Sequence, residues 1–156
     1  MARVLIWIER GAQICAALFL LLLLVMVLMQ VGLRYGGGSV PAYTEEIARY
    51  SMLWMALLAT SVAVRDASHI RIDIVPDMLR ARMPRAARIL RLCLDVLTFA
   101  LFLILAWYGV DMVRFAALQT SDGLRVPLSY PYLVVPAAFL LSAVFALAKL
   151  VVERGR

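Results

Sequence analysis

The sequence predicts an all-α membrane protein with four transmembrane helices and both termini in the cytoplasm. Its composition, four long apolar runs and an uneven distribution of basic residues predict this fold. Of the 156 residues, 65% are hydrophobic, and the mean hydropathy is +0.92. A soluble domain of this size is usually about 45–50% apolar and has too little interior to bury the surplus. The composition therefore argues against a soluble enzyme and is typical of a multi-pass membrane protein.

Each of the four apolar runs is long enough to cross a bilayer. They form a single domain over residues 1–156 and lie at about 14–33, 47–64, 92–113 and 128–150. About 20 helical residues, each rising 1.5 Å, span a hydrocarbon core of about 30 Å. None of the runs alternates like a barrel strand, and a backbone in lipid must bond internally, so we expect four helices.

The first run resembles a signal peptide because Arg3 and Arg10 precede it. Its apolar stretch exceeds the usual 7–15 residues, however, and no small-residue cleavage pattern follows, so we expect a retained helix. The glycines at 36–38 and then Pro41 predict a short turn to the second helix.

Polar residues gather at the start of the second helix. Thr44 can cap this helix, and Glu45 and Glu46 favour the positive end of its dipole. Glu45 precedes Arg49 by four residues, which is the better order for an ion pair. Arg49 either snorkels to the interface or is buried against another helix or subunit, and the cost of a charge there favours burial. Trp54 lies near the middle of the helix, where a packing role is expected.

Between the second and third runs lies a basic loop with seven arginines from Arg65 to Arg91. Its segment 75–83 starts with a proline and an acid, and Met78, Leu79 and Met83 can share one face. We expect a short amphipathic helix in the cytoplasmic interface, and an irregular basic loop is the alternative.

The third and fourth runs carry few polar residues. Asp95 and Asp111 lie near the ends of the third, and the fourth contains Pro136 and ends near Lys149. Four spans place the N-terminus, the basic loop and the C-terminus on one side. That side holds 12 of the 16 basic residues, against 3 in the opposite loops. Because cytoplasmic loops are basic, both termini are predicted to be cytoplasmic.

The chain offers few groups for chemistry. His69 is the only histidine, which disfavours intrachain bis-histidine haem, a zinc site and a catalytic triad. Cys15 and Cys93 are not in a ligand-spaced motif, and no recognition motif for nucleic acid accompanies the positive charge. We therefore expect no enzyme activity, no cofactor, no metal and no nucleic-acid partner, and we expect anionic lipid headgroups beside the basic loop.

Glu45, Glu46 and then Arg49 open the second helix, Trp54 follows within it, and an H-I-x-x-D pattern from His69 to Asp73 marks its cytoplasmic end. Together these motifs resemble one family, the small membrane subunit (DctQ type) of tripartite ATP-independent periplasmic (TRAP) transporters. The entry into the fourth helix also resembles the family at Leu124, Val126-Pro127-Leu128 and residues 132–136, whereas Arg125 departs from it. The residues that carry roles by this resemblance, as subunit-interface or structural positions, are Glu45, Glu46, Arg49, Trp54, Arg65, His69 and Asp73.

The resemblance implies a scaffold subunit of a sodium-coupled importer in the bacterial inner membrane. In such a complex a large permease subunit carries the substrate and sodium sites, and a periplasmic binding protein delivers an organic acid, typically a carboxylate. A stand-alone small exporter is an alternative, although the first run lacks the acid that such exporters use. A second alternative is a non-catalytic membrane anchor subunit of another complex.

The charge asymmetry generates a topology prediction. A reporter fused after Arg156 should read as cytoplasmic, and one inserted near Gly37 or Asp122 as periplasmic, because the basic residues favour the cytoplasm. Paired alkaline phosphatase and fluorescent-protein fusions measure this directly. A periplasmic C-terminus would contradict both the topology and the family assignment.

Overall fold

The computed structural model describes residues 2–70 and 84–154. Its helices are α1 (Ala2–Tyr35), α2 (Ala42–Ile70), α4 (Pro84–Ala116), α5 (Ser129–Tyr132) and α6 (Val134–Arg154). Four stretches are long and apolar enough to cross a membrane, namely Leu5–Tyr35, Ala42–Arg65, Ala86–Ala116 and Ser129–Leu150. The prediction of an all-helical chain with four spans is confirmed for the described residues, whose only β-type pairing is an isolated bridge between Thr120 and Pro127.

The first three long helices extend past the apolar runs that predicted them. α1 begins at Ala2 rather than near residue 14, and α4 begins at Pro84 rather than near residue 92. Hydropathy marks only the part of a helix that lies in hydrocarbon, whereas the backbone hydrogen bonds continue through the interface. The predicted interfacial helix at 75–83 lies outside the described residues.

The fourth span is broken into α5 and α6 at Leu133. Pro136 lacks an N–H and cannot bond the carbonyl of Tyr132, so the helical ladder loses a rung at this point. Gly109 of α4 lies against the same bend, where a Cβ on Gly109 would be 3.1 Å from the Pro136 nitrogen. The absence of a side chain at Gly109 therefore lets α4 approach the broken helix closely.

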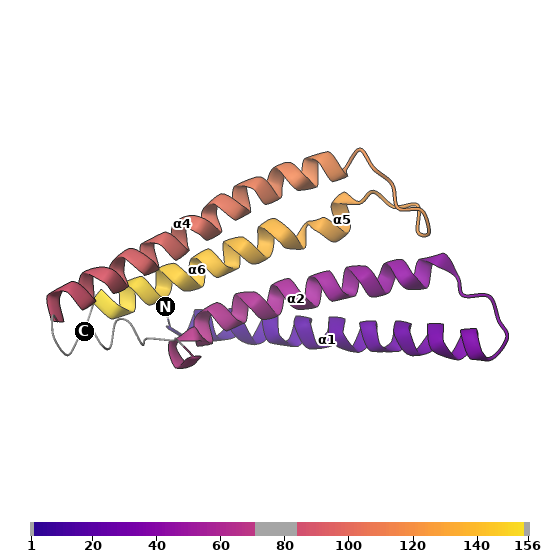
Figure 1. Cartoon of the computed structure of the whole chain (residues 1–156), viewed down its shortest axis with the longest axis horizontal. Helices are drawn as coiled ribbons and strands as arrows, with labels where there is room; N and C mark the ends of the chain where they lie inside the picture. Colours follow the sequence, from indigo (N-terminus) through magenta and orange to yellow (C-terminus); the bar gives the residue numbers. More distant parts are fainter. Residues whose placement is uncertain (1, 71–83, 155–156) are drawn as a thin grey trace.

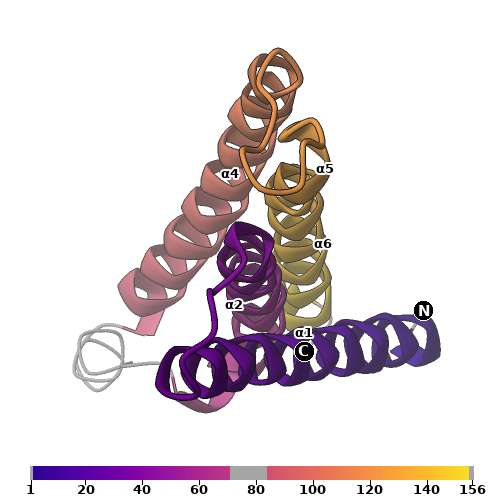
Figure 2. The same ribbon diagram turned by 90° about the vertical axis from the view of Figure 1, so that its right-hand side faces the viewer.

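The helices are arranged as an open row rather than a closed bundle. α1 packs on α2, α2 on α6, and α6 on α4, so that α1 and α4 form the two edges (Figure 1). Figure 2 shows α2 above α1 and beside α6 in the turned view. The start of α1 and the end of α6 lie at the same end of the molecule (Figure 1).

Between α1 and α2 the chain makes the short turn that the glycine run predicts. Gly37 has a φ of +76°, which a side chain would disfavour. The Gly36 and Gly38 amides donate to the carbonyls of Gly32 and Leu33, both at 2.9 Å, and so satisfy the last turn of α1. The first two helices are consequently joined as a tight antiparallel pair.

The interior consists mainly of small side chains. Its buried members include Ala48, Ala106 and Ala143, together with the hydroxyl residues Ser61 and Ser142. Large apolar side chains point outward instead, and many are about half exposed, as expected for surfaces in contact with lipid. Close approach of backbones, rather than burial of bulky residues, therefore holds the described helices together.

Candidate functional site

Helix α2 contacts the C-terminal third of the chain along a line of hydrogen bonds, here called the α2–α6 seam. It consists of Glu46, Trp54 and Ser61 of α2 and, opposite them, the loop 121–124, Pro131 and Ala138. The pairs Glu46–Gly123, Trp54–Pro131 and Ser61–Ala138 are each 77 residues apart in the sequence. This constant separation means that α2 runs parallel to α5 and α6 in a fixed register. The three α2 residues are about two turns apart and share one face.

At one end of the seam, the Glu46 carboxylate holds the loop before α5. One oxygen accepts the Gly123 amide at 2.9 Å, and the other accepts the Leu124 amide at 3.0 Å and the Ser121 hydroxyl. The Ser121 hydroxyl also accepts from the Leu124 amide at 3.2 Å. Charge-assisted bonds of this kind are stronger than neutral ones, so a single side chain orders three donors of an otherwise irregular loop.

The loop backbone fits closely against the first turn of α2. A Cβ on Gly123 would lie 3.0 Å from the Ala42 carbonyl carbon and from the Tyr43 amide nitrogen. Arg125, where the sequence departs from the family pattern, has a φ of +54° in this loop. Thr44, expected to cap α2, instead donates its hydroxyl to the Pro41 carbonyl at 2.7 Å, because the helix begins two residues earlier, at Ala42.

In the middle of the seam, Trp54 connects three helices. Its indole Nε1–H donates to the Pro131 carbonyl of α5 at 3.0 Å. Its ring lies 5.0 Å from that of Phe19 in α1, centroid to centroid. Carbonyls are left without intrahelical donors where a helix breaks, and water cannot replace those donors in hydrocarbon. Trp54 thus supplies a donor beside the break and packs on α1 at the same time.

Ser61 forms the third level of the seam. Its hydroxyl is 2.9 Å from the carbonyls of Leu57 in its own helix and Ala138 in α6. Ser142 reaches the same Ala138 carbonyl at 2.9 Å. Ser61, Ala138 and Ser142 are each at most 1% exposed. Small residues allow this close approach, and the shared carbonyl fixes the register of α2 on α6.

Arg65 binds the end of α2 to the start of α1. Its guanidinium donates to the Leu5 carbonyl at 3.0 Å and pairs with the Glu9 carboxylate. The same guanidinium carbon lies 5.8 Å from the centre of the Phe145 ring in α6. An arginine has several donors and a flat stacking face, so one side chain can contact three helices.

The surfaces that α2 and α6 leave exposed differ in kind. On α2 the exposed residues follow a helical stripe, here called the α2 face: Glu45, Arg49, Met52, Ala56, Ala59, Thr60 and Ala63. On α6 the exposed residues include Leu140, Val144 and Leu147, which are 46–50% exposed. The α6 surface therefore has the bulky apolar character of a lipid-facing helix, whereas most of the α2 face consists of small or charged residues.

The Glu45–Arg49 pair lies on the outside of this chain. Arg49 Nη2 is 2.9 Å from Glu45 Oε1, and the two side chains are 68% and 69% exposed. The expected ion pair is present, but neither side chain is buried against another described helix of the chain. Burial against a second subunit remains a prediction.

The other residues selected from the sequence have different outcomes. Glu46, Trp54 and Arg65 all join separate helices or loops of the same chain. His69 lies in the last described turn of α2, and Asp73 lies outside the described residues.

Sequence reasoning missed the partners of these side chains. Glu9 could have been found, because it is the only acid among the first 44 residues, within an otherwise basic N-terminal stretch. Ser121 and the carbonyl of Pro131 give no signal in the sequence. A backbone acceptor beside a helix break becomes visible only when the tertiary contact is known.

The hydrogen bonds of the α2–α6 seam and of Arg65 hold the helices in place and leave the α2 face exposed. In the part of the chain that the structure describes, no three His, Cys, Asp or Glu side chains gather as a metal site would require. The polar side chains of the seam are all bonded to the protein itself. The class defined by this fold is a four-span membrane protein whose internal polar groups serve helix packing.

Comparison with known proteins identifies the family. Residues 23–154 match the family described as tripartite ATP-independent periplasmic transporters, DctQ component, and the chain belongs to this family. It is 36% identical over 110 residues, 69% of its length, to the isethionate TRAP transporter permease protein DctMQ of Oleidesulfovibrio alaskensis. It is 32% identical over 73 residues, 47% of its length, to a protein of Haemophilus influenzae provisionally named a TRAP transporter small permease protein. The matches cover 17% and 45% of these relatives.

The two adjacent acids of α2 provide a matched test of the seam. In Glu46→Gln an NH₂ group replaces one of the two oxygens, both of which accept bonds from the loop, and a donor then faces a donor. We expect the loop to detach, so that a cysteine introduced as Leu124→Cys, with Cys15 and Cys93 replaced by Ser, reacts several-fold faster with a water-soluble maleimide. Glu45→Gln should leave the rate unchanged, because Glu45 does not bond the loop. Equal rates in both variants would contradict this role of Glu46.

A second pair of variants tests the middle of the seam. Trp54→Phe keeps an aromatic ring against Phe19 but removes the donor to Pro131. Hydrogen bonds between membrane helices contribute about 0.6 kcal/mol on average and at most about 1.7, so we expect a loss of stability within that range. Thermal unfolding in detergent micelles measures it. Trp107→Phe is the control, since Trp107 is 74% exposed and should cost nothing measurable.

Proposed function

We propose that this chain is the small scaffold subunit of a TRAP transporter and that its α2 face packs against a transmembrane helix of the large permease subunit. The observation that carries the proposal is the contrast between exposed surfaces. The α2 face is formed mostly of small residues and ends in the Glu45–Arg49 pair, whereas α6 exposes leucines and a valine. Small side chains at four-residue spacing let a second helix approach closely. Lipid chains do not need small side chains for contact, so lipid alone does not account for such a surface.

The charged pair supports the same occupant. Both side chains are within the candidate span Ala42–Arg65 and are more than two-thirds exposed. Charged groups inside a membrane span are costly unless they face protein or water. A partner helix that presents a carboxylate or hydroxyl to Arg49 and its own small residues to Ala56 and Ala59 fits this surface. The name of the Oleidesulfovibrio relative, a DctMQ permease, accords with a small and a large subunit in one assembly.

The remaining parts of the proposal concern the whole complex. The large subunit carries the substrate and sodium sites, a periplasmic binding protein delivers an organic acid, and sodium entry drives uptake. The small subunit widens the static scaffold in the inner membrane, with both termini in the cytoplasm and lipids around its outer surface. Family membership and the arrangement of packing contacts support this division of labour.

The Arg49 guanidinium is the most direct test of the α2 face. If it is buried against the large subunit, Arg49→Ala leaves a carboxylate unpaired, which costs about 3–5 kcal/mol. We therefore expect lower yield of the co-purified complex and lower transport together, with substrate binding by the binding protein unchanged. Arg49→Lys should rescue only partly, because a point charge lacks the planar fork of a guanidinium.

Arg114→Ala is the matched control for Arg49→Ala. Arg114 is also exposed and also pairs along its own helix, with Asp111 at 3.4 Å, but it lies on α4. Surface pairs contribute about 0–1 kcal/mol, so this variant should assemble as the wild type does. Normal assembly and transport by Arg49→Ala would mean that Arg49 is only a snorkelling end charge.

A further inference from the structure

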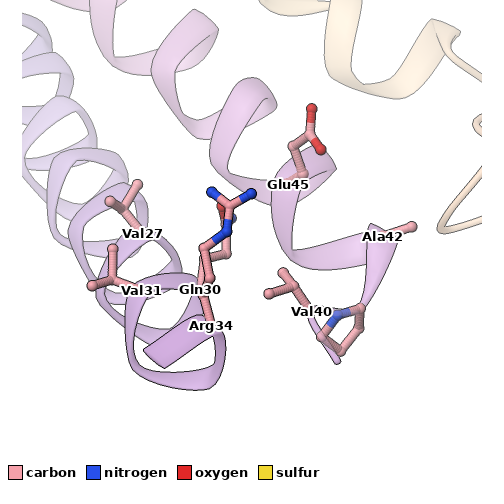
Figure 3. Close-up of a pocket in the computed structure, with 8 residues that line it drawn as sticks. Val27, Gln30, Val31, Arg34, Val40, Ala42 and Glu45 are labelled. Carbon is pink, nitrogen blue, oxygen red and sulfur yellow. The ribbon is translucent and has the colours of Figure 1, made fainter. Parts of the chain in front are cut away.

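A cavity of about 310 Å³ lies between α1 and α2 at the end of the molecule opposite the start of α1. It is lined by Val27, Gln30, Val31, Arg34, Val40, Pro41, Ala42 and Glu45. Figure 3 shows Arg34 extending from α1 into the space between the helices, with Glu45 on the first turns of α2. The seam and the α2 face explain neither Gln30 nor Arg34.

Gln30 is the first sign of a ligand. Its side-chain nitrogen is buried and has no hydrogen-bond partner among the residues that the structure describes. A buried donor without an acceptor is destabilising. Gln30 also interrupts an apolar run that would otherwise continue from Ile14 to Val31. A polar residue at this depth indicates a hydrogen-bond acceptor that the described part of the chain does not provide.

The cavity combines two opposite charges with that donor. The Arg34 guanidinium makes no hydrogen bond or ion pair within residues 2–70 and 84–154. On the opposite wall, only Oε1 of Glu45 is bonded, to Arg49, so that Oε2 remains available. One side of the cavity thus suits an anion and the other a cation.

The depth of the cavity matches that of lipid headgroups. Arg34 and Glu45 lie within one turn of the facing ends of the two candidate spans, Leu5–Tyr35 and Ala42–Arg65. Val27 and Val31 extend one wall toward the hydrocarbon. The phosphate of a lipid would lie beside Arg34, its primary ammonium beside Glu45, and the start of its two acyl chains beside the two valines.

We propose that this cavity binds the headgroup of a zwitterionic phospholipid of the phosphatidylethanolamine class. Arg34 and the Gln30 amide bind the phosphate, and Glu45 accepts hydrogen bonds from the ammonium. The valines contact the upper part of the acyl chains. All residues of the site belong to this chain, and Glu45 is the one residue that the site shares with the α2 face.

The test uses the delipidated full-length chain in detergent, with bound lipid measured by native mass spectrometry. Phosphatidylethanolamine should bind about tenfold more tightly than phosphatidylglycerol, whose headgroup has no ammonium for Glu45. Soluble glycerophosphoethanolamine is the third probe, and it should bind weakly because it lacks acyl chains. Equal binding of the two lipids would overturn the zwitterionic assignment, and tight binding of the soluble probe would replace the lipid with a free phosphoester.

Variants separate lipid binding from a structural role. Arg34→Gln should weaken phosphatidylethanolamine binding about tenfold, through the loss of a charge-assisted bond to the phosphate. Arg125→Asn is the control, because Arg125 is an exposed arginine of the 117–128 connection that does not line the cavity, and Asn tolerates its positive φ. It should bind lipid as the wild type does.

Gln30→Leu supplies a readout that a purely structural residue would not give. Without lipid, this variant should melt at a higher temperature than the wild type, because an orphan donor has been removed. With phosphatidylethanolamine present, its gain in melting temperature should be smaller than that of the wild type. A variant that is destabilised equally with and without lipid would overturn the proposal, as would a cavity that binds no lipid and whose Arg34→Gln variant instead loses the large subunit.

Discussion

The parallel register of α2 on the broken fourth span is the constraint on which the described structure depends. Three side chains of α2 bond partners that lie 77 residues further along the chain, at Gly123, Pro131 and Ala138. The Trp54 and Ser61 bonds lie within the candidate spans, where no water can replace a lost partner, so a slip of α2 would leave both of them unpaired at once. The register is therefore specified by polar satisfaction, although most residues of the interface are small and apolar.

This register decides which surfaces remain free. α2 is committed to α1 on one side and to α6 on another, and the stripe from Glu45 to Ala63 is left outside the row. Arg65 fixes the far end of α2 to α1 through Leu5 and Glu9, so that α2 is held along most of its length. The scaffold role proposed for this chain requires a rigid helix with one face exposed, and these contacts accord with it.

The fold was largely predictable because its determinants are local. Apolar runs locate spans, glycines locate the turn, and the proline at 136 lies one turn beyond the break at Leu133. The sequence singles out Glu46 and Trp54 as candidate structural positions but does not predict their hydrogen-bond partners. Those partners are backbone groups and a loop hydroxyl that lie far away in the sequence. Arg49 could be placed in an ion pair but not assigned a face, since helical periodicity does not say which side a missing subunit covers.

The cavity between α1 and α2 is another feature that the sequence alone does not predict. Gln30 stands out in the sequence only as an interruption of an apolar run. The structure shows that it lines a cavity together with Arg34 of the same helix and Glu45 of α2. The polar side chains of the seam are bonded within the chain and hold the helices together. The Gln30 amide nitrogen, by contrast, has no hydrogen-bond partner among the described residues.

Photo-crosslinking from the two exposed surfaces tests most directly whether α2 faces the partner. A photoreactive amino acid would replace Ala59 on the α2 face or Leu140 on α6 in cells that also express the large permease subunit. The account predicts a crosslinked product of the two subunits from position 59 and none from position 140. Crosslinks from 140 and none from 59 would contradict it, because the lipid-like surface would then be the interface.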